Sequence, residues 1–166
     1  MNRKVYLIGM PGAGKTTFGK ILAQALDWSF IDLDHEIEKT AGKTITEIFQ
    51  DQGEAAFREA EKHALQHLAD QAVDLVIATG GGAPCFHHNM TLMNASGITI
   101  FLNPSLEELE KRVKQENQRP LFHGTSVRKK LEALYRSRID HYNKAQFKIK
   151  TNNPDVHQVL TETGLS

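Results

Sequence analysis

One segment constrains the fold of this chain more than any other: residues 9–16, with the sequence GMPGAGKT. It fits the pattern G-x-x-x-x-G-K-[ST] in full, and it lies between an apolar run at 4–8 and a helical pattern at about 15–26. In this context glycines let backbone amides close around phosphate oxygens, and the helix N-terminus adds partial positive charge. We therefore predict a phosphate-binding loop between a first strand and a first helix.

Apolar runs and helical patterns alternate along the rest of the chain. Further strands are predicted at 30–34, 75–78, 98–102 and 147–149. Helices are predicted at about 15–26, 44–49 and 51–69, after Pro104, up to about Asn143 and from about Pro154, with caps at Thr44 and Asp51. This alternation favours a parallel sheet with helices on both faces. The predicted fold class is α/β, with three α/β/α layers around a central five-stranded parallel sheet in a single domain over 1–166.

Composition and charge exclude several functions. Lys plus Arg and Asp plus Glu both number 20, so the chain lacks the basic footprint of a nucleic-acid binder. It contains no apolar run long enough to span a membrane and no signal-peptide core. The single cysteine, Cys85, cannot form an internal disulfide, which favours a reducing compartment, and we assign it no role. We expect a cytoplasmic monomer with no nucleic-acid or membrane partner.

A phosphate-binding loop alone serves kinases, GTPases and motor ATPases. A GTPase needs the base-reading pattern N-K-x-D, and the nearest string, residues 143–146 (NKAQ), lacks the aspartate. No D-x-x-G pattern follows the third strand, and the chain is short for a motor protein. A small-molecule or nucleotide kinase remains, with Lys15 on the outer phosphates of ATP and Thr16 on Mg²⁺.

Two acidic residues end the second predicted strand. Asp32 and Asp34 alternate with Leu33, so we expect both carboxylates on one face of the strand. We also expect this strand to end beside the first strand, close to the phosphates. The alternative is a solvated strand end at which Asp34 caps a helix.

Six segments, taken in their joint order and spacing, resemble the shikimate kinase family over essentially the whole chain. They are residues 9–16, 32–34 (DLD), 57–61 (FREAE), 79–82 (TGGG) and 119–121 (RPL), and Arg138 followed by Tyr142. The resemblance implies transfer of the γ-phosphoryl of ATP to the 3-hydroxyl of shikimate, in chorismate and aromatic amino-acid biosynthesis. It also implies a P-loop kinase fold with a mobile lid over about 112–126.

The resemblance assigns roles on the acceptor side of the site. Asp34 would orient or deprotonate the attacking hydroxyl, and Asp32 would support Mg²⁺ through water. Arg58 and Arg138 would hold the acceptor carboxylate, to which the planar guanidinium fork is suited, and Glu61 would hold Arg58 in place. The implied substrate-binding set is completed by Phe49, Phe57, Gly80, Gly81 and Gly82. Spacing alone equally fits Arg58 and Glu61 as an ordinary i,i+3 pair on a helix surface.

On the nucleotide side the resemblance extends the phosphate loop. The implied ATP-binding set is Gly12, Ala13, Gly14, Lys15, Thr16, Thr17, Arg112, Arg119 and Pro154. Arg119 would act as an arginine finger in the lid, so the implied catalytic residues are Lys15, Asp34 and Arg119.

One departure from the family pattern affects the late arginine. Asp140 stands where the family usually has a proline between Arg138 and Tyr142, and it could compete for Arg138. Arg136 is a second arginine nearby, but on a helix it points roughly 200° away from Arg138. Two other functions stay open at this point: another small-molecule kinase such as gluconate kinase, and a nucleotide-binding module without turnover.

Overall fold

The computed structural model describes residues 3–116 and 126–165 of the 166-residue chain. Its centre is a sheet of five parallel strands in the order β2-β3-β1-β4-β5. The strands are β1 (Lys4–Ile8), β2 (Ser29–Asp32), β3 (Leu75–Ala78), β4 (Ile98–Leu102) and β5 (Phe147–Ile149). The predicted bounds of all of these strands except β2 are confirmed.

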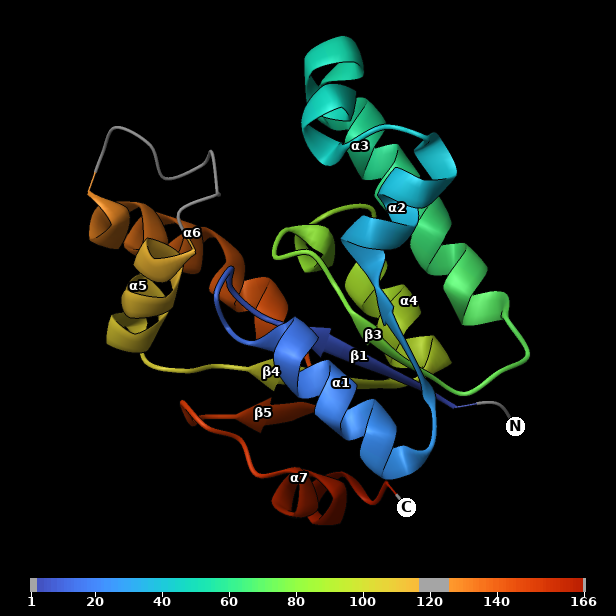
Figure 1. The fold of residues 1–166 in the computed structure, drawn as a ribbon, viewed down its shortest axis with the longest axis vertical. Coiled ribbons are helices and arrows are strands. Elements are labelled where there is room, and N and C mark those ends of the chain that lie inside the picture. The colour runs from blue at the N-terminus through green and yellow to red at the C-terminus, as the bar shows by residue number, and fades with distance from the viewer. Residues whose placement is uncertain (1–2, 117–125, 166) are drawn as a thin grey trace.

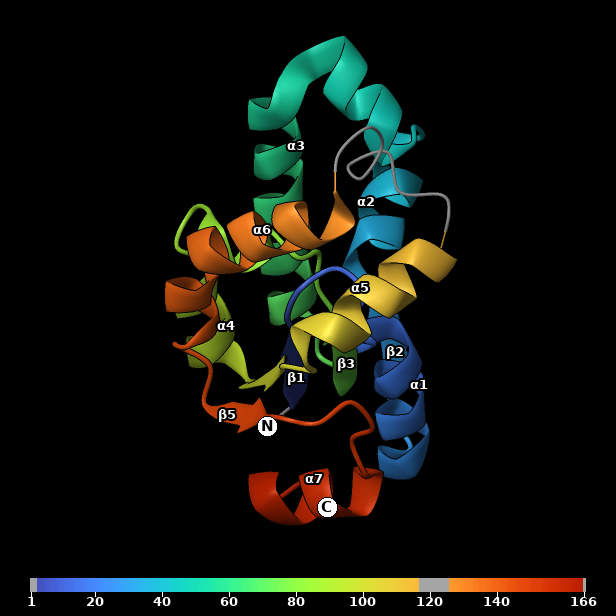
Figure 2. The same ribbon diagram turned by 90° about the vertical axis from the view of Figure 1, so that its left-hand side faces the viewer.

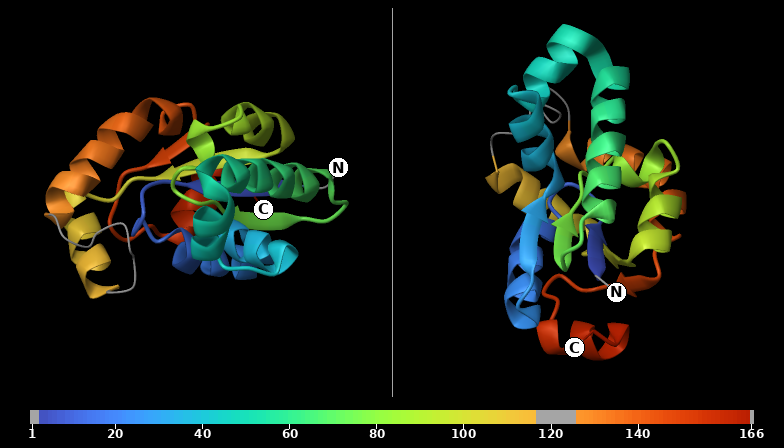
Figure 3. Two further views of the ribbon diagram at one scale, coloured as in Figure 1. Left: turned by 90° about the horizontal axis from the view of Figure 1, so that it is seen from above. Right: turned by 90° about the vertical axis from the view of Figure 1, so that its right-hand side faces the viewer.

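Helices cover both faces of the sheet, as the alternation of elements predicts (Figures 1 and 3). On one face lies α1 (Lys15–Leu26), with α7 (Val156–Thr163) beside it; on the other lie α3 (Ile45–Asp70) and α4 (Asn89–Ser96). Near the carboxyl ends of the strands, α5 (Leu106–Gln115) packs against α6 (Val127–Tyr142) (Figure 2). The remaining elements are α2 (Leu33–Ala41), which packs on α3, and the 3-10 turn η1 (Ala83–Cys85). The predicted three-layer α/β/α fold is confirmed.

The core runs along the central strands, and every residue of β1 and β3 is buried. These strands show no alternation of apolar and polar residues because helices cover the sheet on both faces. Lys4 is the one charged residue in these two strands, and it is buried. Its Nζ donates hydrogen bonds to the carbonyls of Gln71 at 2.9 Å and Val73 at 2.6 Å, just beyond the end of α3. This core holds the loops at the carboxyl ends of the strands on a rigid platform.

The second strand corrects three expectations. It ends at Asp32, and Leu33 already begins α2, so Asp32 and Asp34 do not alternate along one strand. The helix N-cap is Asp32 rather than Asp34: its Oδ1 accepts from the backbone amides of Asp34 at 3.1 Å and His35 at 3.3 Å. Those amides have no partner inside the helix, which is why an aspartate is favoured at this position. In the sheet β3 lies between β2 and β1, so β2 is not the neighbour of β1.

The region predicted as two helices at 44–49 and 51–69 is one element with a break. Thr44 caps α3 as expected: its hydroxyl accepts from the Glu47 amide at 3.2 Å, and Glu47 Oε2 accepts from the Thr44 amide at 2.7 Å. The break falls at Gly53, which has φ 82° and ψ 174°, a conformation that glycine adopts without a Cβ clash. The cap predicted at Asp51 is wrong, since that carboxylate instead accepts from Lys43 Nζ at 2.8 Å.

None of the helices that the structure describes combines the length and the apolar character needed to cross a membrane.

Candidate active site

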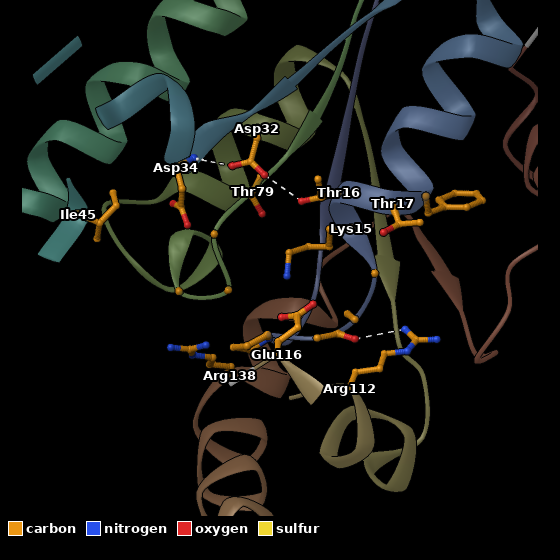
Figure 4. Close-up of a pocket in the computed structure, with 18 of the residues that line it drawn as sticks. Lys15, Thr16, Thr17, Asp32, Asp34, Ile45, Thr79, Arg112, Glu116 and Arg138 are labelled. Atoms are coloured by element: carbon orange, nitrogen blue, oxygen red, sulfur yellow. Dashed lines mark hydrogen bonds between the residues drawn. The ribbon is translucent and has the colours of Figure 1, made fainter. Parts of the chain in front are cut away.

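A cavity of ≈ 790 Å³ lies where the phosphate loop (residues 9–16), the end of β2 and the segment after β3 meet (Figure 4). Ligands of open parallel sheets bind at the carboxyl ends of the strands, and this cavity has that position. Every predicted site residue that the structure describes lines it: Gly12, Ala13, Gly14, Lys15, Thr16, Thr17, Asp32, Asp34, Phe49, Phe57, Arg58, Glu61, Gly80, Gly81, Gly82, Arg112, Arg138 and Pro154. The fold therefore brings residues from nine different elements and loops into one cavity.

The phosphate loop has the backbone that its motif predicts. Gly12 and Gly14 have φ of 82° and 88°, and Gly14 caps α1 without a side-chain hydrogen bond to the first-turn amides. Those amides are the donors that a phosphate can use. Lys15 Nζ donates to the carbonyls of Gly9 at 2.8 Å and Met10 at 2.9 Å, so the ammonium group lies against its own loop.

Asp32 connects the phosphate loop to α2. Its Oδ2 accepts a hydrogen bond from Thr16 Oγ1 at 2.9 Å, while its Oδ1 caps α2 (Figure 4). A hydroxyl and a carboxylate side by side are oxygen ligands of the kind that Mg²⁺ prefers. The residues of this corner therefore fit the predicted metal site.

Two carboxylates face the glycine turn (residues 79–82) that follows β3. Asp34 Oδ1 and Glu61 Oε2 are buried, and neither has a hydrogen-bond partner among the described residues. A Cβ added at Gly80 would lie 3.0 Å from Asp34 Oδ1 and 3.4 Å from Glu61 Oε2, so both oxygens point at the same glycine. Buried acceptors without partners are costly, which makes this spot suited to a ligand that donates hydrogen bonds.

Burial sets the acidity of both groups. It raises the pKa of Asp34, with a smaller contribution from the Asp32 charge, while the Lys15 ammonium opposes the shift. Burial raises the pKa of Glu61 to about 7, against the opposing effect of the Arg58 guanidinium. A carboxylate with a raised pKa accepts a proton more readily.

Arg58 is held on several sides and is only 9% exposed. Its Nη1 donates to Glu61 Oε1 at 3.0 Å, and its Nη2 donates to Glu54 Oε1 at 3.3 Å. The guanidinium carbon lies 5.0 Å from the ring centroid of Phe57 and 4.1 Å from that of Phe86. The i,i+3 ion pair therefore exists, but it is buried beside the cavity rather than on an exposed helix surface.

Arg138 and Arg136 both lie inside α6 and are exposed to different degrees. Arg138 is half-buried and lines the cavity, whereas Arg136 is exposed and is absent from its lining. A Cβ added at Gly81 would lie 2.8 Å from Arg138 Nη1. Asp140 is exposed, and in the described part of the chain no ion pair joins it to Arg138. The choice of Arg138 over Arg136 thus agrees with the direction in which each side chain leaves the helix.

Arg112 joins the phosphate loop to the loop that precedes α7. Its Nη1 donates to the Gly12 carbonyl at 3.2 Å, and its Nη2 donates to the Asn152 carbonyl at 2.6 Å. Glu108 Oε1 accepts from Nε at 2.9 Å and so fixes the orientation of the guanidinium. Pro154 lines the same cavity, so Arg112 and Pro154, two members of the implied ATP-binding set, both lie at the loop that precedes α7.

Arg119, with the rest of the segment 119–121, lies outside the described residues. Of the predicted lid at 112–126, residues 112–115 belong to α5, and Ser126 caps α6.

The cavity is also lined by residues that belong to none of the predicted catalytic, binding or metal sets. They are Pro11, Phe18, Ile21, Ile45, Thr79, Glu116, Asn152 and Asn153. Thr79 had a usable signal, since it leads the TGGG segment, and its hydroxyl donates to the Leu7 carbonyl at 3.1 Å. Asn152 and Asn153 directly precede Pro154 and could have been included with it.

Comparisons with known proteins identify the family. The family model described as shikimate kinase matches residues 11–164. The shikimate kinase of Parabacteroides distasonis is 43% identical over 165 residues, which cover 97% of this chain and 92% of that protein. The shikimate kinase of Persephonella marina is 38% identical over 160 residues, covering 96% of each.

Solved structures agree. The crystal structure of shikimate kinase from Bacteroides thetaiotaomicron matches with a TM-score of 0.92 at 36% identity, covering 98% of this chain and 99% of that one. Shikimate kinase from Acinetobacter baumannii in complex with shikimate matches with a TM-score of 0.87 at 36% identity, covering 98% and 90%. The chain belongs to the shikimate kinase family.

Proposed function

We propose that this member of the shikimate kinase family transfers the γ-phosphoryl group of ATP to the 3-hydroxyl of shikimate, giving shikimate 3-phosphate and ADP. The observation that carries the proposal is the single cavity in which the phosphate loop faces two orphan carboxylate oxygens and two arginines. The shikimate complex of the Acinetobacter relative supports the choice of acceptor. The reaction would serve the biosynthesis of chorismate and aromatic amino acids.

The two arginines suit an acceptor that carries a carboxylate. Arg138 approaches Gly81 and Arg58 approaches Gly82, so the two guanidinium groups flank consecutive glycines. Two planar forks that converge in this way bind one carboxylate with charge-assisted hydrogen bonds. Phe49 and Phe57, whose ring centroids lie 4.9 Å apart, offer an apolar wall for the ring of the acceptor.

Asp34 is proposed to orient the attacking hydroxyl and to take its proton. Its orphan Oδ1 needs a donor, and the acceptor hydroxyl is one. Phosphoryl transfer depends mainly on positioning and on charge neutralisation, and Lys15 is proposed to supply the latter. To do so its ammonium must leave the carbonyls of Gly9 and Met10 for the nucleotide phosphates.

Mg²⁺ is proposed to sit beside Thr16 and Asp32, where it would neutralise charge on the phosphates of the nucleotide. No group of three acidic, histidine or cysteine side chains suited to a metal occurs within residues 3–116 and 126–165. The hydroxyl and carboxylate alone are too few ligands, so ATP must bring the remainder. Arg112 and Pro154 are proposed to hold the adenine, and Arg119 remains a predicted arginine finger.

A coupled ADP-release assay across shikimate, gluconate and nucleoside monophosphates tests the proposal. We expect ADP release with shikimate as the acceptor, and none with gluconate or with the nucleoside monophosphates. Preferred use of gluconate would favour the sugar-acid kinase alternative, and ATP binding without turnover on any acceptor would favour a non-catalytic module. The monomeric state and the cytoplasmic location expected from the sequence stay predictions.

A further inference from the structure

Tyr142, the last residue of α6, is fully buried and has a hydroxyl that reaches the glycine turn. This hydroxyl donates a hydrogen bond to the Gly81 carbonyl at 2.5 Å. It also lies 4.0 Å from the sulfur of Met10 in the phosphate loop and interacts with the Arg138 side chain. One buried hydroxyl therefore meets the glycine turn, the phosphate loop and the late arginine.

The hydrogen bond fixes the orientation of one peptide group. The described residues contain no cis peptide, so the Gly81 carbonyl and the Gly82 amide, which share one peptide plane, point in opposite directions. With the carbonyl held on Tyr142, the Gly82 N–H is directed away from the buried hydroxyl. Gly82 lines the cavity, and no described residue accepts a hydrogen bond from its N–H, whereas the amides of Ala83 and Cys85 are both used within the turn.

The same peptide determines where two cations can sit. A Cβ at Gly81 would lie 2.8 Å from Arg138 Nη1, and one at Gly82 would lie 2.6 Å from Arg58 Nη2. Both guanidinium groups are thus packed directly against the turn. A rotation of the Gly81–Gly82 peptide would change the spacing of the two groups proposed to hold the acceptor carboxylate.

We infer that Tyr142 is a positioning residue for acceptor binding, which acts by holding the Gly81 carbonyl and through it the Gly82 amide, Arg58 and Arg138. Tyr142 itself is not among the residues that line the cavity, so it acts through the groups that do. The inference rests on the proposed function for the identity of the acceptor, but its structural content concerns the turn. Burial raises the pKa of Tyr142, so the group stays a neutral hydrogen-bond donor at working pH.

The chain offers a matched control in Tyr6. Tyr6 is also fully buried, and its hydroxyl shares a hydrogen bond of 2.8 Å with Ser96 Oγ. It belongs to β1 and is absent from the cavity lining. Tyr142→Phe and Tyr6→Phe each delete one buried hydroxyl, so thermal unfolding should show comparable losses of stability in the two variants.

The kinetic constants separate positioning from stability. In Tyr142→Phe we expect the KM for shikimate to rise roughly tenfold, as befits a lost hydrogen bond to a buried carbonyl, while the KM for ATP stays within about twofold. In Tyr6→Phe we expect both constants to be unchanged. Calorimetric titration of shikimate without nucleotide should reproduce the difference between the two variants.

Several outcomes would overturn the inference. A purely structural role would lower kcat in proportion to the folded fraction and leave the KM for shikimate unchanged. Equal effects of Tyr142→Phe and Tyr6→Phe on the KM for shikimate would also indicate a purely structural role. If Tyr142→Phe does not fold, Phe101→Leu provides the second test: the Phe101 ring lies 5.0 Å from that of Tyr142, so this variant loosens the ring but keeps the hydroxyl. Phe101→Leu must then raise the KM for shikimate more than the KM for ATP. An equal change in the two KM values would reject the inference.

Failure of the proposed function is recognised separately. The wild-type protein is assayed first against shikimate, gluconate and nucleoside monophosphates. If another acceptor is the one turned over, the proposed substrate is wrong, and the same pair of variants is compared on that acceptor. A rise in its KM in Tyr142→Phe alone would still support the positioning role, and no rise would reject it.

Discussion

The two ends of the cavity are built in different ways. The phosphate end comes from one continuous stretch, residues 9–16, which offers mostly backbone groups and the start of α1. The acceptor end is assembled from side chains and turns that are distant in the sequence: Asp34 on α2, Arg58 on α3, the glycine turn after β3, and Arg138 on α6. A local backbone site depends little on the remainder of the fold, whereas the acceptor end depends on how four elements pack together. Damage to each end should therefore have a different signature.

Lys15→Ala should have the largest effect, because it removes the lysine ammonium group from the phosphate end and leaves the backbone of the loop intact. We expect kcat to fall by at least about 10³-fold, as for loss of a main charge-stabilising group, with unchanged circular dichroism and near-normal thermal unfolding. Lys20→Ala, an exposed lysine on the same helix, is the control and should keep kcat within about twofold. Near-normal kcat in Lys15→Ala would refute the phosphate assignment.

Asp34→Asn tests whether the acceptor end carries chemistry as well as binding. Asparagine keeps the shape but cannot take the proton, so kcat should fall by roughly 10²–10⁴-fold while the KM for ATP changes little. Steady-state kinetics with each substrate varied in turn gives both constants. A variant that retained most of its kcat would remove Asp34 from the catalytic residues.

Arg138→Ala should weaken the acceptor end without touching the phosphate end. Loss of one charged partner of a buried carboxylate costs about 2–5 kcal/mol, so the KM for shikimate should rise at least about 30-fold. Arg136→Ala is the matched control on the same helix and should have little effect, because Arg136 is exposed and lies outside the cavity lining. The reverse ranking would show that the assignment of the late arginine is wrong.

Gly53→Ala probes the bend in α3 that separates Phe49 from Arg58. Gly53 has φ 82° and ψ 174°, a region almost restricted to glycine, so alanine should lower the free energy of unfolding by about 1–3 kcal/mol. Gly42→Ala is the comparison, since Gly42 has the ordinary left-handed φ of 64° and should cost about 1 kcal/mol. A Cβ meets no atom within 4 Å at either position, so only the backbone differs. Urea unfolding measures the free energy of unfolding of both variants. Equal losses in the two variants would contradict the backbone strain proposed at the bend.

The smallest expected effect concerns pH. Burial raises the pKa of Glu61 from its ordinary value of 4.5 to about 7, so the folded protein binds this proton more tightly than the unfolded chain. The stabilising contribution is fully present below about pH 4.5 and is lost as pH rises through about 7. Glu61→Gln should therefore flatten the decline in unfolding free energy between pH 5 and 7 by an amount on the order of 1 kcal/mol. An unchanged slope would show that Glu61 is not the group responsible.

Much of the phosphate end could be predicted from sequence because its determinants are local. The first strand, the loop with its glycines and lysine, and the first helix follow one another directly within residues 4–26. The predicted bounds of four of the five strands agree with the structure. The errors arose where a local pattern had two physical solutions. Asp32 and Asp34 fit an alternating strand as well as a helix start, and unpaired amides at the start of α2 decide for the helix.

Features that depend on long-range packing could not be predicted in this way. The position of β3 between β1 and β2 is a property of the whole sheet. Glu61 is fully buried although it is a charged residue on a helix, and the hydrogen bond from Tyr142 to Gly81 joins residues 61 positions apart. At the acceptor end the site residues were predicted from the resemblance to a family. Only the fold explains why these residues face one another.

The immobilisation of Arg58 has a consequence for selectivity. An arginine side chain held by two carboxylates and two aromatic rings has already lost its rotamer freedom, which is worth about 2 kcal/mol, when the chain folds. Acceptor binding then carries no entropic penalty for ordering this guanidinium. The same preorganisation prevents the fork from following a carboxylate that arrives a fraction of an ångström out of place. A homologous acid with a longer or shorter arm should therefore be rejected rather than accommodated.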